Sequence, residues 1–225
     1  MKGIFVVGTD TGVGKSIVTG LLGRYLQEKN YRVITQKWIQ TGSRVSADIN
    51  LHLKIMGIPK KKIKDYLVYV CPYKFLLPAS PHLASRQENK RISIAKIKQS
   101  FKLLSAKFDF VIVEGIGGAL VPVDQKRLMI DIAKELDLAV LVVAQNKLGA
   151  INHTLMTIEA INNRKMKILG ILFNNLKGEK KLIAKDNPDI IKKITKQNII
   201  GILPWDKKLD RLYKKFLPIA GKIIA

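Results

Sequence analysis

The chain has 225 residues, 47% of them hydrophobic and 25% charged. This composition suits a folded domain with a sizeable core and excludes wholesale disorder. The one cysteine, Cys71, excludes an intramolecular disulfide and a zinc site built from cysteines. No apolar run reaches the roughly 20 residues that span a bilayer, and the N-terminus lacks a signal-peptide core of normal length. We therefore expect a cytoplasmic protein with no membrane partner.

The charge balance is strongly basic. Lys and Arg number 40 and Asp and Glu number 17, so the formal net charge is +23. One interpretation is a lysine-rich solvated surface that also attracts small anions, and the other is a surface for a polyanion. The lysines are spread along the chain and their densest cluster, 60–64, is short, which favours the first interpretation. A nucleic-acid partner is therefore not expected.

Apolar runs alternate with helical segments along the chain. The runs predict strands at 3–8, 32–36, 108–113, 138–144, 168–173 and 199–203. Helices are expected at 16–30, 154–163 and 189–196. The strands are apolar throughout, as in a sheet covered on both faces, and helices separate them. This order predicts a three-layer α/β fold with a mostly parallel, doubly wound sheet flanked by helices. Residues 43–107 are interpreted as an excursion of helices and loops, so one domain is expected over 1–225.

A glycine-rich loop joins the first strand to the first helix. Residues 8–16 read Gly-Thr-Asp-Thr-Gly-Val-Gly-Lys-Ser. They match G-x-x-x-x-G-K-[ST] except that Thr9 replaces the first glycine and Gly8 comes one place early. The pattern and its place between strand and helix indicate a phosphate-binding loop and a P-loop NTPase-like fold.

The residue types in this loop suit a triphosphate. Gly12 and Gly14 remove the Cβ atoms that would block a phosphate, and the helix N-terminus adds a partial positive charge. Lys15 can reach the β- and γ-phosphates, and the Ser16 hydroxyl can ligate Mg²⁺. We therefore predict that ATP or another nucleoside triphosphate binds here with Mg²⁺.

Three polar residues follow at positions that a parallel sheet brings to the same edge. Glu114 comes directly after the strand at 108–113 and is a candidate Mg²⁺ ligand, with a glycine-rich turn behind it. Lys37 ends the second strand and is a candidate for binding the transferring phosphoryl group or an anionic intermediate. Asp48 is either a further metal ligand or a helix N-cap.

Later segments carry weaker signals. The helix that begins near 149–152 has free amides that can bind a carboxylate. His153 is interpreted as structural rather than catalytic. Asn174 ends a strand and is a candidate for reading adenine through its amide. Pro204 and Trp205 end the last strand and are candidates for packing on a base, although Trp205 has an equal claim to be a core residue.

The ordered set of motifs resembles the dethiobiotin synthetase family, biotin-pathway enzymes with the P-loop fold. The matching segments occur in the family's order over most of the chain: 8–16, Lys37 with 40–42, 78–82, 114–118, 147–149 with 151–153, Asn174 and 201–204. Two positions depart from the pattern. Trp38 stands where many members have proline, and Gly12 replaces a glutamate found in some members.

The resemblance implies a reaction. One amine of 7,8-diaminononanoate takes up CO₂ as a carbamate, and ATP phosphorylates the carbamate to a carbamic–phosphoric anhydride. The second amine then closes the ureido ring and expels phosphate, so the products are dethiobiotin, ADP and phosphate. No protein nucleophile and no histidine base are needed.

The resemblance also implies roles for particular residues. The catalytic set is Lys37, Lys15 and Thr11, and Thr11 would donate to the γ-phosphate or the carbamate. The ATP set is Thr11, Gly12, Val13, Gly14, Lys15, Ser16, Asn174 and Pro204, and the Mg²⁺ ligands are Ser16, Asp48 and Glu114. The substrate set is Thr41 and Gly117, joined by Gly149, Ala150, Ile151 and Asn152 of the neighbouring subunit, which implies a homodimer. Further substrate contacts within 176–198 are not assigned.

The main alternative is a partitioning-type P-loop ATPase, some of which bind DNA. Such proteins usually carry a lysine early in the phosphate loop, where this chain has Thr-Asp-Thr at 9–11. They also tend to place aspartates where this chain has Glu114 and Gly115. Both differences favour the synthetase resemblance.

Overall fold

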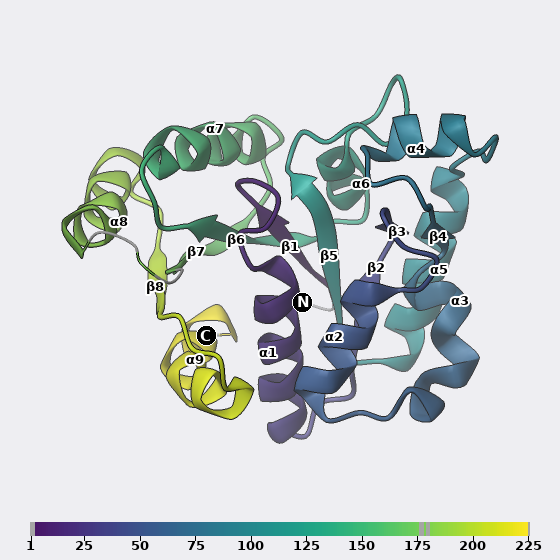
Figure 1. Ribbon diagram of the computed structural model, residues 1–225, viewed down its shortest axis with the longest axis horizontal. Helices are drawn as coiled ribbons and strands as arrows, with labels where there is room; N and C mark the ends of the chain where they lie inside the picture. Colours follow the sequence, from purple (N-terminus) through teal and green to yellow (C-terminus); the bar gives the residue numbers. More distant parts are fainter. Residues whose placement is uncertain (1–2, 176–177, 179–180, 225) are drawn as a thin grey trace.

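The computed structural model describes residues 3–175, 178 and 181–224, and it has a central sheet with helices on both sides (Figure 1). The sheet has six parallel strands in the order β2-β5-β1-β6-β7-β8. These strands are β1 (Gly3–Gly8), β2 (Val33–Lys37), β5 (Phe110–Gly118), β6 (Ala139–Gln145), β7 (Ile168–Asn174) and β8 (Ile199–Leu203). All six predicted strands and the parallel, doubly wound arrangement are confirmed.

The helices cover both faces of the sheet (Figure 1). They are α1 (Lys15–Glu28), α2 (Ala47–Met56), α3 (Leu67–Val70), α4 (Pro81–Gln87), α5 (Ile94–Lys107), α6 (Met129–Glu135), α7 (Ala150–Asn162), α8 (Lys181–Thr195) and α9 (Leu209–Ile224), with a 3₁₀ helix at Lys60–Tyr66. A short parallel pair, β3 (Ile39–Gln40) and β4 (Tyr73–Lys74), lies outside the main sheet. None of the helices in the described part of the chain is both long enough and apolar enough to cross a membrane.

Two hydrophobic cores form because successive side chains of a strand point to opposite faces. In β1, Ile4 and Val6 pack with the apolar faces of α1 and α9. Phe5 and Val7 belong to the other core, with residues of α5, α6 and α7. All four side chains are at most 1% exposed, and each such burial contributes roughly 1.5–3 kcal/mol. The central strand is therefore fixed from both sides, and it leads directly into the phosphate loop.

The end of β5 differs from the prediction. The segment Glu114–Gly118 was expected to be a turn after the strand, but the strand continues to Gly118. Parallel neighbours explain this, because Glu114 pairs with Val6 of β1 and with Lys37 of β2, and Gly118 pairs with Gly8. Glu114 therefore projects from the middle of a paired strand rather than from a loop.

Two helices also differ from the prediction. The helix expected at 189–196 is only the second half of α8, which begins at Lys181 and contains Pro188. The C-terminal helix α9 was not predicted at all. Its apolar residues Leu212, Phe216, Ile219 and Ile223 recur at helical spacing and are buried.

Candidate active site

The phosphate loop lies between β1 and α1 and depends on glycine for its shape. Gly12 and Gly14 have φ angles of +75° and +98°, a region in which residues with a side chain are strained. A Cβ on Gly14 would also lie 2.2 Å from Asn174 Nδ2. That Nδ2 atom donates a hydrogen bond of 3.0 Å to the carbonyl oxygen of Val13. Asn174 lies at the end of β7, which is separated from β1 by β6 in the sheet. Its hydrogen bond therefore stabilises the phosphate loop.

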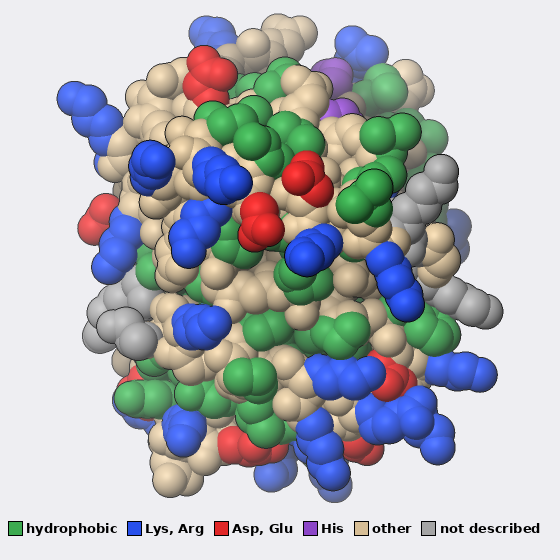
Figure 2. Space-filling view, turned by 90° about the vertical axis from the view of Figure 1, so that its left-hand side faces the viewer, with side chains coloured by type: hydrophobic (Ala, Val, Ile, Leu, Met, Phe, Trp, Pro, Cys, Tyr) green, Lys and Arg blue, Asp and Glu red, His purple; other side chains and the backbone are tan. Residues whose placement is uncertain are grey.

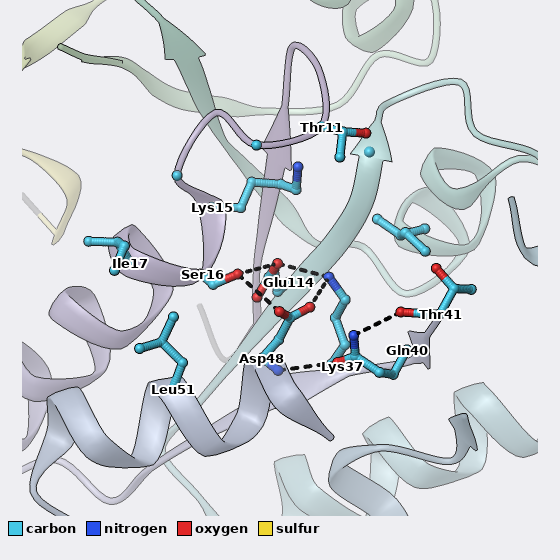
Figure 3. A pocket seen from close by; sticks show the side chains of 14 residues that line it. Thr11, Lys15, Ser16, Ile17, Lys37, Gln40, Thr41, Asp48, Leu51 and Glu114 are labelled. Carbon is cyan, nitrogen blue, oxygen red and sulfur yellow. Dashed lines mark hydrogen bonds and ion pairs between the residues drawn. The ribbon is translucent and has the colours of Figure 1, made fainter. Parts of the chain in front are cut away.

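A cavity of about 380 Å³ lies between this loop, α2 and the end of β5 (Figure 3). Ten of the predicted site residues line it: Thr11, Gly12, Gly14, Lys15, Ser16, Lys37, Thr41, Asp48, Glu114 and Gly117. The remaining lining residues, Ile17, Gln40, Leu51 and Ile116, were not predicted. The fold thus collects side chains from positions 11 to 117 around one space.

Lys15 extends along the phosphate loop. Its side chain is largely buried, and Nζ donates to the carbonyl oxygen of Asp10 at 2.9 Å. Burial, with the nearby Lys37 ammonium, lowers the pKa of Lys15 to about 8. An anionic ligand in the cavity would offset both effects, so the site is electrostatically suited to phosphate.

Ser16, Asp48 and Glu114 meet on the cavity wall (Figure 3). Ser16 Oγ donates to Glu114 Oε1 at 3.0 Å and lies 3.4 Å from Asp48 Oδ1. The N-cap of α2 is Ser46, so Asp48 is not the N-cap that was left open as an alternative. A hydroxyl and two carboxylates are the hard oxygen donors that Mg²⁺ takes beside phosphate oxygens. These residues fit the predicted metal.

Lys37 is enclosed by acceptors. Its Nζ atom donates to Glu114 Oε1 and to the carbonyl oxygen of Gly115, both at 2.8 Å, and it lies 2.8 Å from Asp48 Oδ2. Burial disfavours the charged ammonium, but the carboxylates of Glu114 and Asp48 outweigh it and raise the pKa of Lys37. Burial likewise opposes ionisation of Glu114, but Lys37 and His52 outweigh it and lower the pKa of Glu114 to about 2. The site therefore holds a buried cation between two carboxylates at neutral pH.

Trp38 does not disturb Lys37. Trp38 lies at the bend between β2 and β3, where its side chain enters the core while Lys37 enters the cavity. The Trp38 side chain is fully buried, stacks on Phe5 at 5.6 Å between ring centroids, and donates from Nε1 to Gln36 Oε1 at 2.9 Å. This departure from the family pattern is accommodated by packing.

The remaining predicted residues lie away from this cavity. The Val13 side chain is buried in the core, and Asn174 and Pro204 lie at the ends of β7 and β8. Residues 149–152 form the N-terminus of α7, and the next residue, His153, lines a second, smaller pocket of about 270 Å³ together with Asp10, Leu120 and Met156. Trp205 is 43% exposed, so the core interpretation of Trp205 is wrong.

A buried histidine next to the cavity was also missed. His52 lies on α2 beneath the cavity, and its Nε2 atom is 2.7 Å from Glu114 Oε2. The available signal was its spacing from Asp48, because residues four apart lie on the same face of a helix.

The fold and this loop define the class: the chain is a P-loop nucleotide-binding protein. A family model described as an AAA domain matches residues 2–212. The ATP-dependent dethiobiotin synthetase BioD 2 of Haemophilus ducreyi is 39% identical over 88% of this chain and 93% of that relative. The ATP-dependent dethiobiotin synthetase BioD of Chlorobaculum tepidum is 39% identical over 91% of this chain and 86% of that relative. The chain belongs to the ATP-dependent dethiobiotin synthetase family.

Solved structures with the same fold are more distant in sequence. The MinC:MinD cell division complex of Aquifex aeolicus contains a chain with a TM-score of 0.65 and 14% identity, covering 100% of this chain and 96% of that one. The pNOB8 ParA protein, solved bound to nonspecific DNA, has a TM-score of 0.63 and 13% identity, covering 100% of this chain and 97% of that one. At these identities the likeness concerns the fold alone.

Proposed function

We propose that this chain is an ATP-dependent carbon–nitrogen ligase that converts 7,8-diaminononanoate, CO₂ and ATP to dethiobiotin, ADP and phosphate. The main support is the cavity that joins the phosphate loop to Lys37, in a chain 39% identical to named synthetases over about nine tenths of its length. Lys15 and Lys37 both line this cavity, so a phosphoryl group and its acceptor have cations on two sides.

The nucleotide would occupy the loop side of the cavity. We assign the β- and γ-phosphates to the backbone of 11–16 and to Lys15, because positive-φ glycines and a helix N-terminus present amides to an anion. Ser16, Asp48 and Glu114 would hold Mg²⁺, which when bound offsets phosphate charge. Asn174 holds the loop through Val13, and Asn174 and Pro204 are assigned to the adenine side.

The acceptor would occupy the other end of the cavity. A carbamate is a weak and unstable nucleophile, so the site must hold it against the γ-phosphate with little water. Lys37, Thr11, Thr41 and Gly117 line this end and would orient the carbamate and the second amine. The ammonium of Lys37 would offset the charge that develops during transfer. The amine then attacks the carbonyl of the mixed anhydride, and the C–O bond to phosphate breaks.

We also propose a symmetric homodimer. Large apolar side chains are exposed near the start of α7: Leu148 is 81% exposed, Met156 56% and Leu120 49%. Exposed apolar groups beside a pocket are typical of an interaction surface. In a two-fold dimer this surface would bring 149–152 of one subunit to the site of the other, where free amides would bind the substrate carboxylate.

The test is direct. Purified protein with ATP, Mg²⁺, ¹³C-bicarbonate and 7,8-diaminononanoate should give dethiobiotin one mass unit heavier than with unlabelled bicarbonate, together with ADP and phosphate. Omission of either the diamine or bicarbonate should abolish dethiobiotin. ATP hydrolysis that ignores the diamine, with no dethiobiotin formed, would refute the proposal.

The structural similarity to MinD and ParA proteins raises one alternative function, that of a partitioning-type ATPase. A partitioning-type ATPase would use a basic surface to bind DNA. In Figure 2, however, Lys and Arg are scattered over the face that is drawn, with acidic and hydrophobic side chains between them. We therefore propose a metabolic enzyme of the cytoplasm without a nucleic-acid partner, and salt-sensitive ATP-dependent retention on DNA would favour the alternative.

A further inference from the structure

His52 is a buried histidine outside the predicted catalytic set. Its side chain is fully buried on α2, and its Nε2 atom lies 2.7 Å from Glu114 Oε2. An ionised carboxylate only accepts hydrogen bonds, so Nε2 carries the hydrogen in this contact. Nδ1 has no hydrogen-bond partner among the described residues. The one polar contact of the ring is therefore directed at Glu114.

The two oxygens of Glu114 have different partners. Oε2 faces His52, while Oε1 accepts from Ser16 Oγ at 3.0 Å and from Lys37 Nζ at 2.8 Å. Glu114 is only 2% exposed, so an oxygen without a protein partner would lack water as a replacement. His52 donates to Oε2 of Glu114, so Oε1 is left facing Ser16 and the cavity.

The packing of α2 on α1 brings His52 within reach. Gly20 of α1 leaves room for α2, because a Cβ there would lie 3.3 Å from His52 Cα and 2.8 Å from Ile55 Cδ1. Asp48 lies one turn before His52 on the same helix. Helix α2 therefore supplies one carboxylate of the cavity, Asp48, and also the histidine that contacts the other carboxylate, Glu114.

We infer that His52 is a positioning residue for the metal site: it orients Glu114 so that Oε1 faces Ser16 and the bound cation. This inference rests on the proposed Mg²⁺ site of Ser16, Asp48 and Glu114. Groups that hold a metal-ligating side chain in place from behind typically contribute about 10- to 100-fold to metal affinity. His52 need not touch nucleotide or substrate to have this effect.

The test measures Mn²⁺ affinity by electron paramagnetic resonance, with protein saturated by ADP. His52→Leu should weaken Mn²⁺ binding by about tenfold or more, because Glu114 loses its rear donor. His52→Gln places an amide near the position of Nε2 and should stay within about threefold of wild type, whereas the shorter His52→Asn should weaken binding as the leucine variant does. ADP affinity in EDTA should be the same for all four proteins.

Ile55→Val is the matched control, because it loosens the same helix contact without touching Glu114. It should bind Mn²⁺ like wild type even where its Tm falls as far as that of a His52 variant. If His52→Leu fails to fold, the difference in Mn²⁺ affinity between His52→Gln and His52→Asn still tests the inference. Wild-type Mn²⁺ affinity in both His52→Asn and His52→Leu would overturn the inference.

Glu114→Gln separates this inference from the proposed function. Weakened Mn²⁺ binding in Glu114→Gln together with unchanged binding in His52→Leu would overturn the role of His52 alone. Unchanged binding in Glu114→Gln would overturn the metal site itself, and with it the role of His52.

Discussion

Lys37 and Glu114 are register partners on adjacent parallel strands, and their side chains form an ion pair of 2.8 Å with only 4% and 2% exposure. The pair is therefore fixed by the sheet as well as by charge. A buried pair of this kind adds little net stability, but loss of one partner leaves the other uncompensated. Such an arrangement is expected where a charged group is needed for chemistry rather than for folding.

Lys37→Ala should lower kcat for dethiobiotin formation by at least about 100-fold, since one preorganised charge typically contributes that much. Initial rates at saturating ATP and diamine test this. The KM for ATP should change far less, because we propose that Lys15 and the loop amides bind the phosphates. A normal kcat with a raised KM for the diamine would show that Lys37 contributes to substrate binding and not to catalysis. Lys74→Ala, an exposed lysine on β4, is the control and should leave kcat unchanged.

Lys15→Ala should abolish ATP turnover and leave the fold intact. Burial lowers the pKa of Lys15 to about 8, so its ammonium still predominates at pH 7 but is less favourable in the folded protein than in the unfolded chain. Removal of the side chain should therefore not lower the Tm of the nucleotide-free protein at pH 7. Calorimetric melting and ATPase assays measure the two effects separately. A nearly normal ATPase rate would contradict the phosphate-loop assignment.

Glu114→Gln should raise the Mg²⁺ concentration needed for half-maximal activity. Glutamine keeps the shape of the side chain but lacks the negative charge, and the low pKa of Glu114 means that wild type supplies this charge throughout the neutral range. A Mg²⁺ titration of initial rates at fixed ATP measures the shift. Superimposable titration curves for variant and wild type would assign Glu114 a purely structural role.

The sequence predicted the sheet well because apolar strand runs and the glycine-rich loop are local signals. It placed Lys15 and Ser16 correctly beside Lys37 and Glu114, because parallel strands end at a common edge. It missed His52 because its contact with Glu114 depends on how α2 packs against the sheet, and the common edge of parallel strands does not determine that packing. It also ended β5 at 113, since a strand that pairs on both sides tolerates glycines that read locally as a turn.

Subunit mixing tests whether each site uses residues of both chains. A Lys37→Ala protein and an Asn152→Ala, Gly149→Pro protein should each be nearly inactive for dethiobiotin formation. After mixing with exchange of subunits, heterodimers would carry one intact site, so activity should recover to about a quarter of wild type. Recovery should fail if the start of α7 serves only its own subunit. Analytical ultracentrifugation of Leu148→Glu, which should favour monomers, checks the interface itself.

Asp206 should make stability depend on pH at the start of α9. Its carboxylate accepts from the backbone N–H of Lys208, from Lys215 Nζ and from Arg211 Nη2, each at 3.0 Å. The Lys208 amide is the largest cause that depresses the pKa of Asp206 below its ordinary value of 3.8. A depressed carboxylate pKa stabilises the folded state above pH 3.8, and this contribution is lost as the pH falls below that value.

Asp206→Asn should therefore have a lower Tm than wild type at pH 7, and the difference should shrink below pH 3.8. Asp65→Asn, at an exposed position, is the control for loss of a surface carboxylate and should have the Tm of wild type at pH 7. A Tm difference for Asp206→Asn that is constant with pH would contradict the assignment.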